Sequence, residues 1–351
     1  MFAEKIINWY HENGRNLPWR CTDNPYYIWL SEIILQQTRI EQGRAYYEHF
    51  ITRYPTVQHL ADATEEQVLK SWQGLGYYSR ARNLHTAARH IAYDLHGVFP
   101  STYKEILALK GVGRYTAAAI ASFAFRLPYP VIDGNVYRLI ARLYGIHTPI
   151  GTTAAQREFE NLLNTLIDPV RPDLFNQAIM DFGSMQCKPT GCDCANCIFS
   201  HECTANKHGQ VALLPVKPNP PKVKERHFYY FDIRWPQPAE TMLIHQRSKG
   251  DIWQGLYELP LLETDTPIPQ RHLRAQALQT LTDWLGTEPA TLQVGPAYTH
   301  QLTHRTIKAQ FLQAKYPCQP AKMPQTLTPI YCETLKTLPI SRLIDRYLSE
   351  M

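Results

Sequence analysis

A proline-rich stretch over residues 214–222 divides the chain into two regions with different hydrophobic patterns. Proline fixes the backbone angle φ and removes a hydrogen-bond donor, so this stretch is predicted to be an extended, semi-rigid connector. At 351 residues the chain is long enough for two hydrophobic cores. We therefore predict a helical domain over residues 1–204, a linker over residues 205–226 and a domain that mixes strands and helices over residues 227–351.

The region before the linker carries apolar residues at helical spacing almost throughout. Beyond a first helix that stops near Asn13 and Gly14, helices are predicted over residues 26–37, 65–72, 80–95, 102–109, 115–125, 136–143 and 156–166. After the linker, strands are predicted over residues 228–233, 242–245, 256–259 and around 307–311, with a helix over residues 271–285 and a loop over residues 299–305.

The composition is that of a soluble protein that could bind a polyanion. No run approaches the apolar length that a membrane span needs, and the first residues lack the pattern of a secretory signal, so we expect a cytoplasmic protein without membrane contact. The net charge of +5 permits a polyanionic partner without requiring one.

Two glycines, Gly111 and Gly113, stand on either side of Val112 just before the helix predicted over residues 115–125. A turn of this kind can direct backbone N–H groups and the helix N-terminus at one anion. An ordinary turn or a helix cap explains the same glycines, so the pattern alone leaves both interpretations open. A carboxylate, Asp133, follows further along the chain.

Glu32 lies inside a predicted helix whose neighbouring positions are mostly apolar. Three of its four helical neighbours, Ile28, Trp29 and Leu35, are apolar, and the fourth is Gln36. A carboxyl group in such surroundings is expected to keep its proton to higher pH, which suits a general acid. The alternative is a glutamate on the protein surface.

Five of the eight cysteines stand between Cys187 and Cys203. Cys187, Cys194, Cys197 and Cys203 are separated by six, two and five residues, so one short loop can surround a single metal centre. Four thiolates suit either a tetrahedral zinc ion or an iron–sulfur cube. Cys192 is a spare that could replace Cys194. The isolated cysteines at positions 21, 318 and 332 are expected to be buried thiols.

The segment Trp253-Gln254-Gly255-Leu256-Tyr257-Glu258-Leu259-Pro260 resembles part of the Nudix hydrolase fold. The paired glutamates that would hold catalytic magnesium do not follow it, and the predicted helix carries Arg271, Arg274 and Gln276 instead. We therefore expect this domain to be a binding module.

With these residues in place, the chain resembles the MutY family of adenine DNA glycosylases over nearly its full length. The matching motifs are Leu17-Pro18-Trp19-Arg20, Trp29-Leu30-Ser31-Glu32, Leu35-Gln36-Gln37-Thr38, Gly74-Leu75-Gly76-Tyr77-Tyr78, Gly111-Val112-Gly113, Asp133-Gly134-Asn135-Val136 and the four-cysteine loop. The resemblance implies a multidomain fold: an all-α, two-lobed helix-hairpin-helix glycosylase domain with a [4Fe–4S] cluster, followed by an α+β Nudix-like domain.

The resemblance also implies the reaction, which is hydrolytic removal of adenine paired with 8-oxoguanine in double-stranded DNA after the nucleotide is flipped out. It implies a monomeric, nucleoid-associated enzyme that also processes adenine opposite guanine. The implied residues are Glu32, Asp133, Tyr115 and Asn135 for catalysis; Trp19, Arg20 and Gln177 for the base pocket; Gln37, Tyr77, Gly111, Val112 and Gly113 for DNA; and Cys187, Cys194, Cys197 and Cys203 for the cluster.

Two positions distinguish this chain within the resemblance. Tyr115 stands where the similar endonuclease III family has a lysine that attacks the sugar and cleaves the strand, which implies a monofunctional glycosylase. Leu302, Thr303 and His304 stand where the family reads 8-oxoguanine with Phe-Ser-His. Leucine can still wedge between bases and threonine keeps the hydroxyl, but the aromatic face is lost.

Two alternatives remain beside the adenine glycosylase. One is an endonuclease III-like glycosylase and lyase for pyrimidine lesions, which Tyr115 and the second domain disfavour. The other is a non-enzymatic DNA-binding protein that uses its cluster as a redox sensor, which the presence of both Glu32 and Asp133 disfavours.

Overall fold

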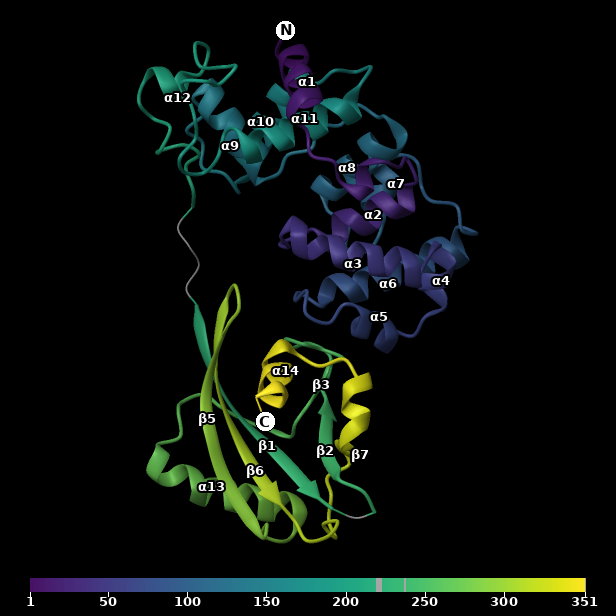
Figure 1. The fold of residues 1–351 in the computed structure, drawn as a ribbon, viewed down its shortest axis with the longest axis vertical. Helices are drawn as coiled ribbons and strands as arrows, with labels where there is room; N and C mark the ends of the chain where they lie inside the picture. Colours follow the sequence, from purple (N-terminus) through teal and green to yellow (C-terminus); the bar gives the residue numbers. More distant parts are fainter. Residues whose placement is uncertain (219–222, 237, 351) are drawn as a thin grey trace. The chain divides into compact units, whose positions relative to one another are not determined.

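The computed structural model describes residues 1–218, 223–236 and 238–350 (Figure 1). The chain forms two compact units: Met1–Asp62 with Asn83–Asn219, and Ala63–Arg82 with Pro220–Met351. Part of the predicted connector, residues 219–222, lies outside the described residues, and the predicted boundaries at residues 204 and 226 stay predictions. The segment Ala63–Arg82 belongs to the second unit, although it precedes most of the first in sequence.

The first unit is helical, and its helices fall into two groups in Figure 1. The helices are α1 (Phe2–Asn13), η1 (Pro18–Arg20), α2 (Pro25–Ile34), α3 (Ile40–Arg53), α4 (Val57–Asp62), most of α6 (Ser79–Arg89), η2 (His90–Asp94), α7 (Tyr103–Ala108), α8 (Arg114–Phe125), α9 (Gly134–Tyr144), α10 (Thr153–Leu166), α11 (Pro172–Met185) and α12 (Thr204–Lys207). One group contains α1 and α9 to α12, whose core includes Phe159, Phe175 and Phe182. The other contains α2, α3, α7 and α8.

Capping side chains fix where several of these helices begin. Asn24 accepts a hydrogen bond from the Tyr26 backbone N at 3.0 Å, with Pro25 at the first helical position of α2. The predicted helix over residues 26–37 is wrong at its end, because α2 stops at Ile34 and Gln37 adopts a left-handed φ of 57°. Helices α3, α4, α11 and α12 were not predicted.

Between α7 and α8, the two hairpin glycines have different conformations. Gly111 is left-handed, with φ of 79°, and a Cβ atom there would lie 2.6 Å from the Asn83 Cβ. Gly113 is the N-cap of α8 with φ of −93°, and a Cβ atom would meet nothing within 4 Å. Only the first glycine is therefore required by backbone geometry.

Replacing Gly111 by Ala is expected to destabilise the hairpin, whereas Gly113→Ala is expected to leave it nearly unchanged. A left-handed alanine alone costs about 1–2 kcal/mol, and the clash with Asn83 adds to it. Thermal melting should place Gly111→Ala below the wild type and Gly113→Ala close to it. Equal melting of the two variants would contradict the assignment.

The second unit is built on one mixed sheet. The strands are β1 (Lys224–Trp235), β2 (Thr241–Gln246), β3 (Tyr257–Glu258), β4 (Leu261–Thr264), β5 (Thr291–Gln301), β6 (Arg305–Lys315) and β7 (Leu327–Tyr331). Their order is β3-β2-β1-β6-β5, with β1 parallel to β6, while β4 pairs with β1 and β7 with β2. The predicted loop over residues 299–305 is wrong in extent, because β5 continues to Gln301 and β6 begins at Arg305.

Helices cover both faces of this sheet. Alternating residues of β1 explain this arrangement, because Phe228 and Tyr230 join the core under α14 (Arg342–Ser349), while Tyr229 and Phe231 join the core under α13 (Gln270–Leu285). The α13 helix was predicted; α14 and the short η3 (Cys332–Thr337) were not.

Residues 63–82 pack within this second unit. Here α5 (Glu65–Ser71) places the Lys70 Nζ 3.0 Å from the Leu338 carbonyl oxygen, and the Glu66 carboxylate accepts a 2.8 Å hydrogen bond from the Tyr257 hydroxyl. The hydroxyl of Tyr78 donates to the Ile340 carbonyl at 3.2 Å.

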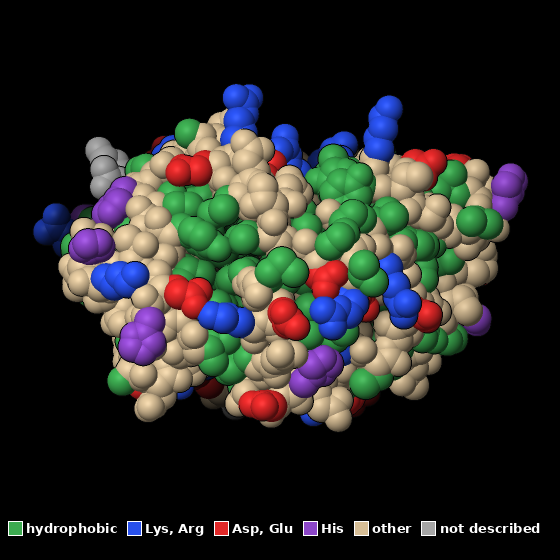
Figure 2. Space-filling view, turned by 90° about the horizontal axis from the view of Figure 1, so that it is seen from above, with side chains coloured by type: hydrophobic (Ala, Val, Ile, Leu, Met, Phe, Trp, Pro, Cys, Tyr) green, Lys and Arg blue, Asp and Glu red, His purple; other side chains and the backbone are tan. Residues whose placement is uncertain are grey.

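The surface is mixed in character. On the face drawn in Figure 2, basic and acidic side chains are interspersed with apolar ones. Among the described helices, none is both long enough and apolar enough to cross a bilayer. The expectation that the isolated cysteines are buried is wrong for Cys21 and Cys318, which are exposed, and Cys332 is only half-buried.

Candidate active site

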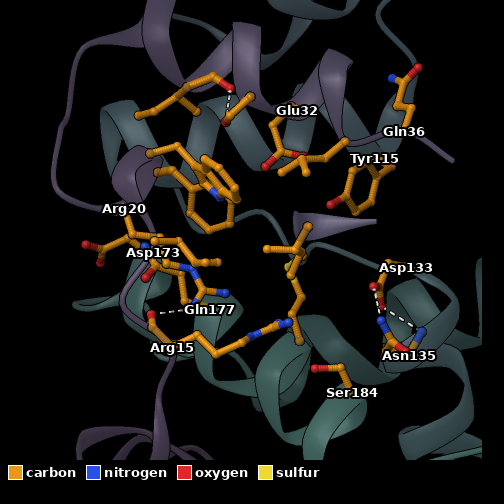
Figure 3. Close-up of a pocket in the computed structure, with 18 of the residues that line it drawn as sticks. Arg15, Arg20, Glu32, Gln36, Tyr115, Asp133, Asn135, Asp173, Gln177 and Ser184 are labelled. Atoms are coloured by element: carbon orange, nitrogen blue, oxygen red, sulfur yellow. Dashed lines mark hydrogen bonds between the residues drawn. The ribbon is translucent and has the colours of Figure 1, made fainter. Parts of the chain in front are cut away.

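A cavity of roughly 830 Å³ opens in the first unit, between elements that are far apart in the sequence. It is lined by residues from η1, α2, α8, α9 and α11, and these include all seven residues predicted for catalysis and for the base pocket: Trp19, Arg20, Glu32, Tyr115, Asp133, Asn135 and Gln177. In Figure 3, Glu32 and Tyr115 face the cavity from one side, and Asp133 and Asn135 face it from another.

Glu32 is held in α2 with only 7% of its surface exposed. Burial raises the pKa of Glu32 to about 7, against the lowering effects of a hydrogen bond from Tyr115 and of the Arg20 charge. The expectation from its apolar neighbours is therefore confirmed. Burial and the adjacent carboxylates raise the pKa of Tyr115 well above its usual value, so its hydroxyl stays protonated.

Asp133 is the N-cap of α9, and its carboxylate accepts three hydrogen bonds. One oxygen accepts from the backbone N of Asn135 at 2.8 Å and of Val136 at 2.7 Å, and the other accepts from the Asn135 Nδ2 at 2.7 Å. Burial raises the pKa of Asp133, and these donors limit the rise because they favour the ionised form. The site thus contains two carboxyl groups in different surroundings.

Asp181, on α11, is a residue that the sequence analysis missed. Its fully buried carboxylate accepts from Arg20 Nη1 and Nη2 at 2.7 and 2.8 Å, and from Arg15 Nε at 2.9 Å. Burial alone would raise the pKa of Asp181, but the hydrogen bonds from both arginines outweigh it and lower the pKa. This ion pair fixes the guanidinium of Arg20 at the cavity wall. In the sequence, a single aspartate within the apolar run around Ile179 and Phe182 could have indicated a buried, paired carboxylate.

The other residues of the predicted base pocket are also fixed by contacts. Gln177 accepts a 2.7 Å hydrogen bond from the Tyr10 hydroxyl at its Oε1. Trp19 is buried, with its ring edge-to-face against Tyr47 at 5.4 Å between centroids. Gln37, exposed and left-handed, lies at the rim of the same cavity.

The predicted cluster ligands come together at a second, smaller cavity. Cys187, Cys194, Cys197 and Cys203 line it together with Cys192 and the apolar side chains of Leu139, Leu143, Phe182 and Phe199. Within residues 1–218, 223–236 and 238–350, no three Cys, His, Asp or Glu side chains converge on one ion-sized position. The thiols surround the cavity instead of meeting at one point.

Two buried arginines of α9 connect this loop to the rest of the unit, and sequence reasoning missed both. Arg138 donates to the Cys187 carbonyl oxygen at 2.8 Å and to the Asn135 Oδ1 at 2.8 Å. Arg142 donates to the Lys188 carbonyl oxygen at 2.7 Å and to the Cys187 Sγ at 3.5 Å. In the sequence, two arginines four residues apart among the apolar residues of this helix could have indicated a pair of buried hydrogen-bond donors.

The predicted DNA-reading residues Tyr77 and Thr303 meet within the second unit. Tyr77 is 48% exposed, has a left-handed φ of 47°, and its hydroxyl is hydrogen-bonded to the Thr303 hydroxyl. The guanidinium of Arg80 lies 5.6 Å from the Tyr77 ring centroid. Leu302 is half-buried and packs against the sheet core, whereas Thr303 and His304 are exposed.

Comparisons with known proteins agree with this architecture. A family model described as HhH-GPD superfamily base excision DNA repair protein matches residues 30–165, and a NUDIX domain model matches residues 233–350. The chain is 31% identical to the adenine DNA glycosylase of Buchnera aphidicola subsp. Baizongia pistaciae (strain Bp), over 88% of this chain and 84% of that protein. It is 34% identical to the adenine DNA glycosylase of Buchnera aphidicola subsp. Schizaphis graminum (strain Sg), over 75% of this chain and 76% of that protein.

Among solved structures, a thermostable thymine-DNA glycosylase is similar with a TM-score of 0.56 and 29% identity, over 59% of this chain and 95% of that one. The predicted fold class, a helical helix-hairpin-helix glycosylase domain followed by an α+β Nudix-like domain, is confirmed. The chain therefore belongs to the adenine DNA glycosylase (MutY) family and is a DNA N-glycosylase of base-excision repair.

Proposed function

We propose that this glycosylase hydrolyses the N-glycosidic bond of adenine paired with 8-oxoguanine in duplex DNA, and that it also acts opposite guanine. The observation that carries the proposal is the pair Glu32 and Asp133, which line one cavity with different hydrogen-bond environments. Two carboxyl groups with divided roles suit the cleavage of a glycosidic bond. The adenine must leave the helix stack to reach them.

Glu32 is the general acid. With a pKa near 7 it is half protonated at neutral pH, and it gives its proton to adenine N7 as the C1′–N9 bond breaks. The electron pair of that bond leaves with the base, which becomes neutral, and the sugar becomes an oxocarbenium-like cation. Arg20 and Gln177, both held in place by hydrogen bonds, orient the base against Glu32.

Asp133 stabilises the sugar cation or captures it transiently as a covalent ester. Its three hydrogen-bond donors keep the carboxylate in a fixed position at the N-terminus of α9. Water then adds at C1′ and releases a proton, which completes the hydrolysis. Tyr115 has no amine and keeps its hydroxyl proton, so a Schiff base cannot form there, and the enzyme is monofunctional.

The lesion opposite the adenine is read by Thr303 and His304 of the second unit. Tyr77 and Gln37 wedge into the base stack, and the hydroxyl of Thr303, which contacts Tyr77, bonds 8-oxoguanine beside His304. Leu302 contributes less than a free wedge would, because the sheet core holds part of its side chain. The hairpin of Gly111, Val112 and Gly113 binds backbone phosphate through its N–H groups.

A [4Fe–4S] cluster held by Cys187, Cys194, Cys197 and Cys203 fits the second cavity better than zinc does. Soft thiols around an apolar space are the donors that such a cluster would take, and all four proposed ligands line this cavity. Burial raises the pKa of Cys187 and of Cys197, so a metal must displace their protons. The cluster would cross-link the loop between Cys187 and Cys203, next to the α9 and α11 side chains that line the cavity.

Base release from a defined duplex tests the proposal. The protein should release adenine opposite 8-oxoguanine, seen as strand cleavage at that position only after alkali treatment. Duplexes with cytosine opposite 8-oxoguanine serve as the control. Strand scission without alkali, together with enzyme–DNA adducts trapped by borohydride, would instead support the endonuclease III-like alternative. Specific binding without any base release would support the non-enzymatic alternative.

A further inference from the structure

The cysteine loop holds one thiol more than the proposed cluster uses. Cys192 stands two residues before Cys194, and both line the same cavity as Cys187, Cys197 and Cys203. With Cys187, Cys197 and Cys203 kept, the loop therefore offers two sets of four thiols, which differ in whether Cys192 or Cys194 is included.

The geometry of the loop makes these two thiols neighbours. The Sγ atoms of Cys192 and Cys194 lie 3.6 Å apart, and the Cys194 backbone N donates to the Cys192 carbonyl oxygen at 3.1 Å. Gly191, with a left-handed φ of 63°, turns the chain just before them. The two sulfurs are therefore neighbours on the wall of one cavity.

Cys192 also shares its surroundings with a proposed ligand. Arg142, which is 3% exposed, places its Nη1 3.5 Å from the Cys187 Sγ and 3.8 Å from the Cys192 Sγ. The Cys203 thiol donates to the Arg142 carbonyl oxygen at 3.3 Å. Arg142 therefore contacts three of the five cysteine sulfurs of the loop. Donors to a ligating sulfur orient it and tune the cluster.

We propose that Cys192 is an alternate ligand that replaces Cys194 in the cluster, an inference that rests on the proposed iron–sulfur centre. Cys192 loses its thiol proton and forms the new Fe–S bond, while the bond to the Cys194 sulfur breaks and that sulfur takes up a proton. No electron is transferred, so neither an oxidant nor a reductant is needed. The loop thereby keeps four thiolates when Cys194 is lost.

Iron and acid-labile sulfide content of the purified full chain tests this substitution. Cys194→Ala is expected to keep most of the wild-type iron and its visible absorbance, whereas the double variant Cys192→Ala/Cys194→Ala is expected to lose both. Cys197→Ala, whose position has no neighbouring spare within the loop sequence, is the matched control and is expected to lose iron like the double variant.

A second measurement does not depend on a variant that lacks a primary ligand. Cys192→Ala keeps all four proposed ligands, and it is expected to lose iron to a chelator faster than the wild type, because a released Cys194 has no substitute. Equal release rates, or a Cys194→Ala protein as poor in iron as the double variant, would overturn the inference while leaving the cluster itself intact. A wild type that carries zinc or no metal would overturn both.

Discussion

Replacing Glu32 by Gln is expected to lower the rate of adenine release by roughly 10²–10⁴-fold, the usual contribution of a general acid. Glutamine has the shape of a protonated glutamate but has no acidic proton to give to adenine N7. Because Glu32 is buried and neutral forms are favoured there, Gln should leave the cavity and DNA binding largely unchanged. Single-turnover base release on the duplex with adenine opposite 8-oxoguanine measures the effect.

The pH profile separates this role from a structural one. In the wild type, the protonated fraction of Glu32 falls tenfold for each pH unit above its pKa of about 7, so the rate should decline there. The residual activity of Glu32→Gln should lack this decline. Glu158→Gln, an exposed change in the middle of α10, is the matched control and should behave like the wild type. A profile that keeps its alkaline limb in Glu32→Gln would remove Glu32 from the acid role.

Features of the fold and the site could be predicted from local sequence where the interactions that determine them lie within one or two helical turns. The raised pKa of Glu32 follows from apolar neighbours on its own helix, and the Asn24 cap follows from a short side chain just before a helical run. The glycine turn before α8 was also visible, but a turn sequence does not show that Gly111 is left-handed and Gly113 is not.

The site itself depends on contacts that no local pattern contains. Asp133 and Glu32 are about a hundred residues apart in sequence, and only the packing of α2, α8, α9 and α11 around one cavity brings them to the same site. Their pairing in the sequence analysis came from the family resemblance and not from spacing. Asp181 was missed for the same reason, since its two arginine partners come from the far end of the chain.

The second unit shows how tertiary context changes the meaning of a motif. Leu302 looks like a free wedge in sequence, but in the hairpin between β5 and β6 its side chain packs against the sheet core. The loop with Tyr77 connects two helices, α5 and α6, yet it packs with the sheet unit and brings Tyr77 to Thr303. Both outcomes depend on contacts between segments that are distant along the chain.

Glu32→Gln is also expected to stabilise the folded protein above neutral pH. Burial raises the Glu32 pKa from its ordinary 4.5 to about 7, so the folded state binds this proton more tightly than the unfolded state does. The resulting stability is fully present below pH 4.5 and is lost as the pH rises through 7. At about 1.4 kcal/mol per pKa unit, the loss is on the order of 3 kcal/mol.

Glutamine stays neutral at every pH and so avoids this loss. The melting temperatures of Glu32→Gln and wild type should coincide at the acid end, separate between pH 4.5 and 7, and differ by roughly 5–10 °C at pH 8. Glu158→Gln, which removes an exposed carboxylate, should show no such separation. If Glu32→Gln melts with the wild type at pH 8, burial does not oppose ionisation of Glu32, and the physical basis for its role as the acid is lost. If Glu32→Gln is more stable than the wild type at pH 8 and also inactive, the buried carboxyl group of Glu32 both lowers the stability of the folded protein at that pH and supplies the catalytic proton.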